Sequence, residues 1–413
     1  MSSSLVCCCF RSSACTVGLR PCGCWGGSTG WRQAGWSGCR DRGRRGMRRG
    51  RKTFSAVWLS QGDQHYPHIV YRRKAELLEM LGEWDRAEAI HRGNLEWLKG
   101  HGYRHQAAVS RMNLGWIMNR RGLGREGLTL LEEAEGVLES DGTDYDRCNV
   151  HNKIGNVCYR LGDYQRAESH FGRSLEISLK RGDLEQEANA LNNLGNVYGD
   201  LGDLDRALEH YQKSYEIGER TRDVYNNAKT AGNLGWCYYA KNDLSRAMEW
   251  YQRSASVAGQ CGDRHLLSVA LGNMAAIFIG RGEFQEAERH VDRRLEIARE
   301  IGDKRGLSIS LSHRGHILRE KGELRAAEDS LGQAVSLARE LDARYFLSMF
   351  LNERAQLLLE MARIDEAVAC NEEALAIATE MGVGKLVDDA TKLRTRLLSG
   401  DAGPLDSEGR RKE

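Results

Sequence analysis

The sequence predicts an all-α fold, a solenoid built from eight helix–turn–helix repeats of 40 residues each. Two columns of small residues predict it, because the first recurs every 40 residues and the second follows it by 12 positions. Large apolar residues flank both columns at helical spacing. The three prolines lie outside the array or at its edge. This position fits uninterrupted helices, because a proline in a helix interior costs about 3 kcal/mol.

The first column predicts where one helix packs closely on another. A residue without a bulky side chain lets two helix backbones approach each other. The first column reads Ala75, Gly115, Gly155, Gly195, Gly235, Ala275, Gly315 and Ala355. The second column reads Ala87, Gly127, Ala167, Ala207, Ala247, Ala287, Ala327 and Ala367. The two columns therefore predict one close helix pair in each repeat.

Each repeat of 40 residues divides into a first helix, a turn and a second helix. Three residues after the first column come large side chains such as Leu78 and Tyr198, which continue the apolar face of the first helix. A break such as Leu201-Gly202-Asp203 follows, in which glycine ends one helix in a left-handed cap and the acidic residue favours the next helix start. The second helix carries an aliphatic column: Val137, Ile177, Ile217, Val257, Ile297, Leu337 and Ile377.

The array is expected to run over residues 66–382 and to be closed by one more helix. Residues 383–398 hold Leu386, Ala390, Leu393 and Leu397 at helical spacing, and we expect this helix to cap the open end of the stack. Residues 399–413 are polar and charged, and we expect a disordered tail.

Charge and cysteine content separate the first 65 residues from the rest. This segment carries 11 basic and 2 acidic residues and seven of the 12 cysteines. The remaining 348 residues carry 49 basic and 56 acidic residues, so the body is mildly acidic and shows no broad basic field for nucleic acid. The scattered cysteines of the body indicate neither a disulfide framework nor a zinc site, and no apolar run is long enough to span a bilayer.

Four interpretations of residues 1–65 stay open, and under each of them we expect disorder. The segment is rich in Ser and Arg, as organelle transit peptides are. Alternatively, Cys7–Cys9 are lipidation sites, and the basic run Arg40–Lys52 then assists membrane binding. A third interpretation is that this run is a nuclear or nucleic-acid patch. The fourth interpretation, which we favour, places the true start downstream, for example at Met47.

The repeat columns resemble the tetratricopeptide repeat family over residues 66–382. Small residues near position 8, alanine at position 20 and a late small column (Ala134, Ser174, Ser214, Ser254, Ala334, Ala374) carry the resemblance. The period of 40 and the Asn-Leu-Gly-Asn stretch at Asn193–Asn196 are similar to the subclass found in G-protein-signalling modulators, kinesin light chains and bacterial signalling proteins. The resemblance implies a right-handed superhelical α-solenoid whose first helices line a concave, partner-binding groove.

Carrying the family's groove positions onto this chain gives a polar and aromatic strip. Asparagine suits such a strip because its amide both donates and accepts hydrogen bonds, and Trp and Tyr add apolar area with a polar tip. The alternative is that the asparagines at position 6 of the repeats brace neighbouring backbones, whereas for Asn152, Asn156, Asn192 and Asn196 binding is favoured. The candidate partner-binding residues are Asn113, Trp116, Asn152, Asn156, Tyr159, Asn192, Asn193, Asn196, Lys229, Asn233, Trp236, Tyr239 and Asn273.

Other motifs are explained by the repeat. Gly122–Gly127 fits G-x-G-x-x-G, but a dinucleotide site needs a preceding strand, whereas the period places this stretch at a turn between helices. The pairs His101/His105 and His313/His316 have helical spacing but lack a third ligand at a recognisable distance. The carboxylate clamp of chaperone-binding relatives is matched at only three of five positions.

From these observations we expect no enzyme, no cofactor and no metal site. The predicted function is a scaffold or adaptor that binds a protein or peptide partner in the groove, with no nucleic acid bound by the array. The alternative is a regulatory or sensor subunit of a signalling complex containing a kinase, cyclase, G protein or transcription regulator. A cytoplasmic location is expected, or an organelle if the N-terminal segment is a transit peptide.

Overall fold

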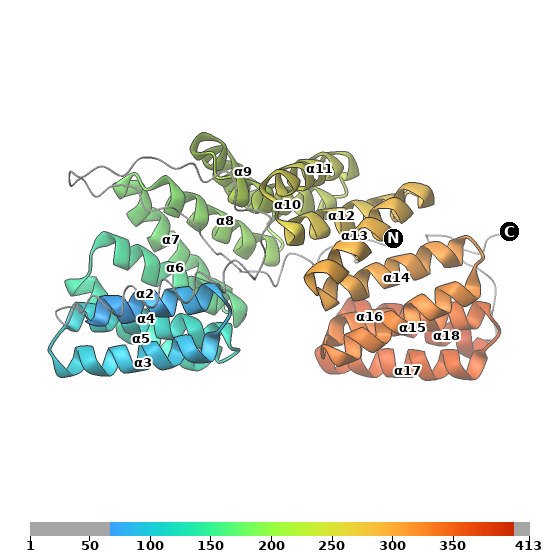
Figure 1. Ribbon diagram of the computed structural model, residues 1–413. Helices are drawn as coiled ribbons and strands as arrows, with labels where there is room; N and C mark the ends of the chain where they lie inside the picture. Colours follow the sequence, from blue (N-terminus) through green and yellow to red (C-terminus); the bar gives the residue numbers. More distant parts are fainter. Residues whose placement is uncertain (1–66, 400–413) are drawn as a thin grey trace. The chain divides into compact units, whose positions relative to one another are not determined.

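The computed structural model describes residues 67–399, and every regular element among them is an α-helix (Figure 1). The disorder expected at both ends falls outside this range, except that Ser399 belongs to the last helix. The helices are α2 (Pro67–Met80), α3 (Trp84–Gly100), α4 (Arg104–Arg120), α5 (Gly124–Asp141), α6 (Asp144–Arg160), α7 (Tyr164–Arg181), α8 (Leu184–Asp200), α9 (Leu204–Thr221), α10 (Val224–Ala240), α11 (Leu244–Cys261), α12 (Arg264–Gly280), α13 (Phe284–Ile301), α14 (Lys304–Glu320), α15 (Leu324–Glu340), α16 (Arg344–Glu360), α17 (Ile364–Met381) and α18 (Gly384–Ser399).

These helices confirm the predicted hairpins and the additional helix after them. Each even-numbered helix from α2 to α16 is the first helix of a repeat, and the next odd-numbered helix is the second. From α2 to α6, and again from α8 to α18, each helix packs on the next helix in the chain. Helix α18 packs on α16 and α17, as expected of a helix that covers the last hairpin.

The described residues fall into two compact units, and the boundary lies between His170 and Phe171. We call residues 67–170 the N-terminal unit and residues 171–399 the C-terminal unit, and each is described by itself. None of the helices in the described range has the length and apolar character needed to cross a membrane.

The turns between helices have the predicted chemistry. Eleven glycines have positive φ, for example Gly202 at +83° and Gly302 at +71°, and they lie at helix ends. The residue after such a position often caps the next helix, as when the Asp303 side chain accepts a hydrogen bond from the Gly306 backbone N–H at 2.9 Å. Four residues with a side chain take the same left-handed conformation: Arg222, Asn242, Asp342 and Ala362.

The first small column makes room for a ring or a leucine from the second helix of the same repeat. A Cβ added at Gly195 would lie 2.6 Å from Tyr211 Cε1, and one added at Gly235 would lie 2.7 Å from Tyr251 Cε1. Where the column holds Ala275, the residue 16 positions later is the smaller Val291. The glycines therefore accommodate large partner side chains as well as close backbones.

Repeat six departs from the late small column and compensates for it. Six repeats hold Ser or Ala in this column and repeat one holds Asn94, whereas repeat six holds Arg294, which is only 2% exposed. The facing first helix holds Gly272, where an added Cβ would lie 2.5 Å from Arg294 Cζ and 2.8 Å from its Nε. The large side chain of Arg294 is therefore accommodated because Gly272 has no side chain.

Candidate functional site

All 13 candidate residues lie on the first helices of repeats two to six. The N-terminal unit holds the five on α4 and α6, and the C-terminal unit holds the eight on α8, α10 and α12. Half-buried are Asn113, Trp116, Asn152, Asn156, Tyr159, Asn193, Asn196 and Lys229. Buried are Asn192, Asn233, Trp236, Tyr239 and Asn273. The half-buried residues are therefore the ones whose side chains are partly exposed to solvent.

Hydrogen bonds between amides join α8 and α10. Asn233 Nδ2 donates to Asn192 Oδ1 at 3.1 Å and to Asn196 Oδ1 at 3.3 Å. Asn192 Oδ1 also accepts from Thr230 Oγ1 at 3.3 Å, and Asn196 Oδ1 accepts from Tyr211 Oη at 2.7 Å. Such a network holds successive first helices in register. Asn192 and Asn233 are therefore in a bracing geometry, whereas Asn196 takes part in the network and is also accessible.

On α6, an amide pair lies at the accessible surface of the N-terminal unit. Asn156 Nδ2 donates to the Asn152 carbonyl at 2.8 Å and to Asn152 Oδ1 at 2.7 Å. This pairing orients Asn156 along its own helix, and it uses only the amide nitrogen of that residue. An amide oxygen held in this way can accept a hydrogen bond from a peptide N–H.

Two lysines on the first helices are shifted toward the neutral form. Burial lowers the pKa of Lys153, although Glu79 and Glu76 act in the opposite direction. Lys153 Nζ also lies 4.9 Å from the centre of the Trp116 ring. Burial lowers the pKa of Lys229 to about 8. Lys153 was missed by sequence analysis because its neighbours come from other repeats, yet it occupies the same repeat position as Asn113, Asn193 and Asn233.

A further polar pair missed from the sequence lies between α14 and α16. Ser312 Oγ donates to Glu353 Oε2 at 2.5 Å. Burial raises the pKa of Glu353, whereas the Ser312 hydrogen bond and Arg319 lower it. Glu353 falls in the same column as Lys153, so this column varies in charge along the chain.

The two histidine pairs singled out by spacing lie in surroundings that do not favour a metal ion. His101 follows the end of α3, stacks on Trp97 and hydrogen-bonds through Nδ1 with the Trp97 carbonyl at 2.8 Å. His105 lies in α4, so the helical spacing assumed from the sequence is interrupted by a turn. His313 is 2% exposed beside Arg294, and burial together with this guanidinium lowers its pKa to about 3. A neighbouring cation disfavours a metal ion there.

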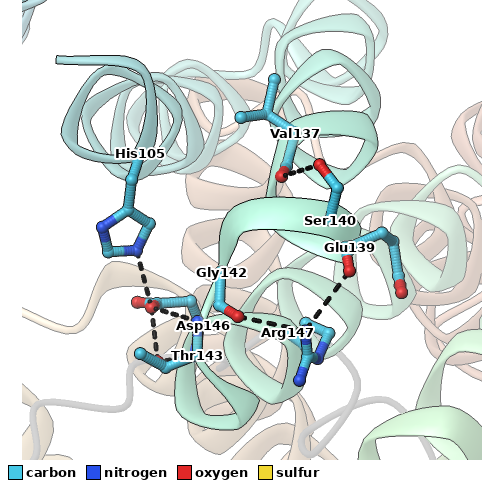
Figure 2. A network of polar contacts seen from close by, with 8 residues as sticks. All are labelled: His105, Val137, Glu139, Ser140, Gly142, Thr143, Asp146 and Arg147. Atoms are coloured by element: carbon cyan, nitrogen blue, oxygen red, sulfur yellow. Dashed lines mark hydrogen bonds and ion pairs between the residues drawn. The ribbon is translucent and has the colours of Figure 1, made fainter.

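Figure 2 shows where His105 is used instead. Its Nε2 lies 2.9 Å from Asp146 Oδ2, which also accepts a hydrogen bond from the Thr143 backbone N–H at 3.1 Å. Thr143 Oγ1 accepts from the Asp146 backbone N–H at 3.2 Å, which completes a capping box at the start of α6. An Arg147 guanidinium nitrogen donates to the carbonyls of Gly142 and Glu139 at 3.0 and 3.3 Å. These bonds fix the junction between α5 and α6.

The G-x-G-x-x-G stretch begins in the predicted turn between helices and continues into the first turn of α5. Gly122 has a φ of +90° in the turn before α5. Gly127 lies inside α5, and a Cβ added there would lie 2.5 Å from the Gly115 carbonyl oxygen. Each of these two glycines therefore has a structural role within repeat two.

Comparison with known proteins agrees with this architecture. A tetratricopeptide repeat family profile matches residues 146–220, 186–260 and 266–340. No curated protein sequence matches the chain.

Solved structures share the fold at low sequence identity. Aspartyl phosphate phosphatase F from Bacillus subtilis superposes with a TM-score of 0.58 at 15% identity, over 79% of this chain and 87% of that one. A signal-transduction ATPase with a tetratricopeptide repeat sensor from Pyrococcus horikoshii gives 0.56 at 15% identity, over 80% of this chain and 47% of that one. The apo quorum sensor NprR from B. thuringiensis gives 0.53 at 14% identity, over 82% and 99%.

Proposed function

Because the chain is a tetratricopeptide repeat protein, we propose that it is a scaffold that binds an extended segment of a partner protein along its first helices. One observation carries the proposal. In each unit, a half-buried lysine whose pKa burial has lowered lies on the helix face that carries half-buried or networked amides. Desolvated lysines and oriented amides suit the carbonyl and carboxylate oxygens of a peptide.

In the N-terminal unit, the binding surface combines apolar area with polar groups. Trp116 and Tyr159 are half-buried and offer aromatic surface, while Lys153 lies over the Trp116 ring. Asn156 lies three residues after Lys153, on the same face of α6. A peptide lying across α4 and α6 would meet an aromatic anchor, a cation and an amide in succession, a combination found at binding hot spots.

In the C-terminal unit, the binding surface rests on a braced amide network. Asn193 and Asn196 are half-buried on α8, and Lys229 is half-buried on α10. The hydrogen bonds from Asn233 hold these helices together, so the binding groups are positioned before a partner arrives. Preorganisation of this kind lowers the entropy cost of binding.

Affinity purification with the full chain tests the proposal. One variant carries Lys153→Met and Asn156→Ala, and a second carries Lys229→Met and Asn193→Ala. The control is Lys213→Met on α9, because Lys213 is exposed and only pairs with Glu209 at 2.6 Å. Circular dichroism should show unchanged helix content for all three.

We expect at least one double variant to lose partners that the wild type and the control recover. Recovery of the same partners at wild-type levels by both double variants would refute binding along the first helices.

A regulatory role is the second candidate. NprR is a quorum sensor, the Pyrococcus repeats form a sensor, and another structure of this fold is a Rap protein complexed with competence and sporulation factor. We propose that, in such a role, the bound segment would act as a signal for an output protein. A partner that changes the activity of a copurifying enzyme would favour this role over a scaffold.

A further inference from the structure

Three residues from three successive helices direct one atom each toward a common point in the N-terminal unit. They are Glu135 on α5, His151 on α6 and His170 on α7. His151 Nδ1 lies 3.1 Å from Glu135 Oε1 and 3.2 Å from His170 Nδ1. His170 Nδ1 lies 3.5 Å from the same Glu135 oxygen. The three atoms therefore form a nearly equilateral triangle.

With a neutral His151, hydrogen bonds alone leave two acceptor atoms facing each other in this triangle. His151 Nε2 lies 2.9 Å from Glu139 Oε1, and because a carboxylate only accepts, Nε2 carries the proton. A neutral His151 then points an Nδ1 lone pair at Glu135 Oε1, which is another acceptor. A second proton on His151 would let Nδ1 donate to Glu135 Oε1, so protonation and a bound cation are the two ways to relieve this contact. A cation at the centre satisfies all three atoms at once.

The spacing matches a tetrahedral metal site. Zinc binds histidine nitrogen and carboxylate oxygen at about 2.0–2.2 Å, so two ligands on a tetrahedron lie about 3.3–3.6 Å apart. The three separations here are 3.1, 3.2 and 3.5 Å, so each lies within or about 0.2 Å below that range. Glu139 on the far nitrogen of His151 is the outer contact that metal-binding histidines usually have, because it fixes the tautomer and raises ligand basicity.

The surroundings of Glu135, His151 and His170 hold these side chains in place and partly shield them from solvent. The His151 side chain is 2% exposed, that of His170 12% and that of Glu135 19%. Figure 2 shows the network at the junction between α5 and α6. Glu139 lies at this junction, in the last turn of α5. The backbone that presents the cluster is therefore fixed by the capping box at Thr143 and by the Arg147 hydrogen bonds.

The repeat supplies an internal comparison. The residues 40 positions after Glu135, His151 and His170 are Leu175, Leu191 and His210. Leu175 and Leu191 belong to an apolar cluster, and His210 Nδ1 hydrogen-bonds with the Arg206 carbonyl at 2.8 Å. Among the described repeats, only this junction holds a carboxylate and an imidazole at these two positions, facing a second imidazole.

We propose that Glu135, His151 and His170 bind a divalent transition-metal ion of the Zn²⁺ class. The ion links α5, α6 and α7 through two nitrogen ligands and one oxygen ligand, and leaves the fourth tetrahedral position to water. Imidazole and carboxylate ligands in this geometry favour Zn²⁺ or Co²⁺ over Mg²⁺ or Ca²⁺, which take six or more oxygen ligands.

Cobalt titration of the full chain tests the proposal. The protein carries no polyhistidine tag, and its accessible cysteines are blocked with N-ethylmaleimide so that thiolates do not contribute. We expect one equivalent of Co²⁺ to produce the visible absorption of a four-coordinate site, and Zn²⁺ to displace it. Added Zn²⁺ should also raise the thermal midpoint, because the ion binds the folded state.

Matched variants separate this site from adventitious histidines. Glu135→Leu with His151→Leu copies the Leu, Leu, His combination of the next repeat, so it should fold yet lose the bound equivalent and the thermal shift. His210→Leu removes the histidine of the corresponding position and should keep both. Glu139→Ala should weaken the affinity by about 10- to 100-fold, as loss of an outer contact does.

Equal Co²⁺ absorption in the wild type and in the double leucine variant would overturn the proposal. So would a wild type that shows no absorption and no Zn²⁺-dependent shift, because His151 would then be a protonated bridge between two carboxylates.

Discussion

Replacing Gly235 with alanine should destabilise the C-terminal unit, although alanine is the better helix former. The added Cβ would lie 2.7 Å from both Cδ1 and Cε1 of Tyr251, whose side chain is fully buried. Overpacking of this kind costs about 1–3 kcal/mol, and a ring with no room to turn falls in the upper part of that range. Alanine is more favourable than glycine in a helix by about 1 kcal/mol, which offsets part of this cost. The net loss should be about 1–2 kcal/mol.

Two further variants isolate the steric cause. Gly332 lies in the interior of α15 with no heavy atom within 4 Å of an added Cβ, so Gly332→Ala should stabilise by about 0.5–1 kcal/mol. Gly235→Ala with Tyr251→Val recreates the alanine and valine pair that repeat six holds at Ala275 and Val291. This double variant should be less destabilised than the sum of its single changes.

Urea unfolding followed by circular dichroism measures these differences. Arrays of repeats need not unfold in one step, so the midpoint and slope of each transition are compared among the variants. If Gly235→Ala raised the midpoint as much as Gly332→Ala, the contact with Tyr251 would not govern this position and the steric reasoning would fail.

Three further predictions concern helix ends and charge. Ala362 holds a φ of +58° between α16 and α17, so Ala362→Gly should stabilise by about 1 kcal/mol in the same urea assay. Thr143→Ala removes the capping box of α6 and should cost about 1 kcal/mol in the same assay. Burial lowers the pKa of Lys229 from 10.5 to about 8, so between these values the unfolded chain binds more protons than the folded one. Stability should therefore rise with pH across that window, as measured by urea midpoints at successive pH values.

Each of these predictions has a matched control. Gly322 has a φ of +79°, so Gly322→Ala should destabilise where Ala362→Gly stabilises. Ser140→Ala removes only a hydrogen bond from Ser140 Oγ to the Val137 carbonyl near the same junction, and should cost less than Thr143→Ala. Lys229→Met should flatten the rise between pH 8 and 10.5, and an unchanged slope would assign it to another group.

The repeat period was sufficient to predict the hairpins, the turns and the additional helix, because each depends on residues close in sequence. The side-chain partners across helices were not predictable in the same way. The side chains of Glu135, His151 and His170 come together because the side-chain rotamers on three helices direct them to one point. Their spacings of 16 and 19 residues match no recognised ligand motif.

The candidate binding strip shows the same limit. Sequence placed the asparagines on the first helices but could not separate accessible amides from braced ones. Asn192 and Asn196 are four residues apart on α8. Asn192 is buried and its amide oxygen accepts two hydrogen bonds, whereas Asn196 is half-buried. Both amides accept from Asn233, and only Asn192 also accepts from Thr230 of the next repeat, a contact that the position within a repeat does not reveal.

The pairing of Arg294 with Gly272 makes repeat six hard to exchange. An Asn or Ser at position 272, as its own column holds in repeats four and seven, would collide with the guanidinium, whose Cζ lies 2.5 Å from an added Cβ. Repeat five holds Gly232 in this column and would avoid the collision. Replacing α12 by a first helix with Asn or Ser in this column, while α13 is kept, should therefore lower the midpoint of urea unfolding. For such exchanges, the hairpin of repeat six has to move as a whole, even though its sequence pattern repeats column by column.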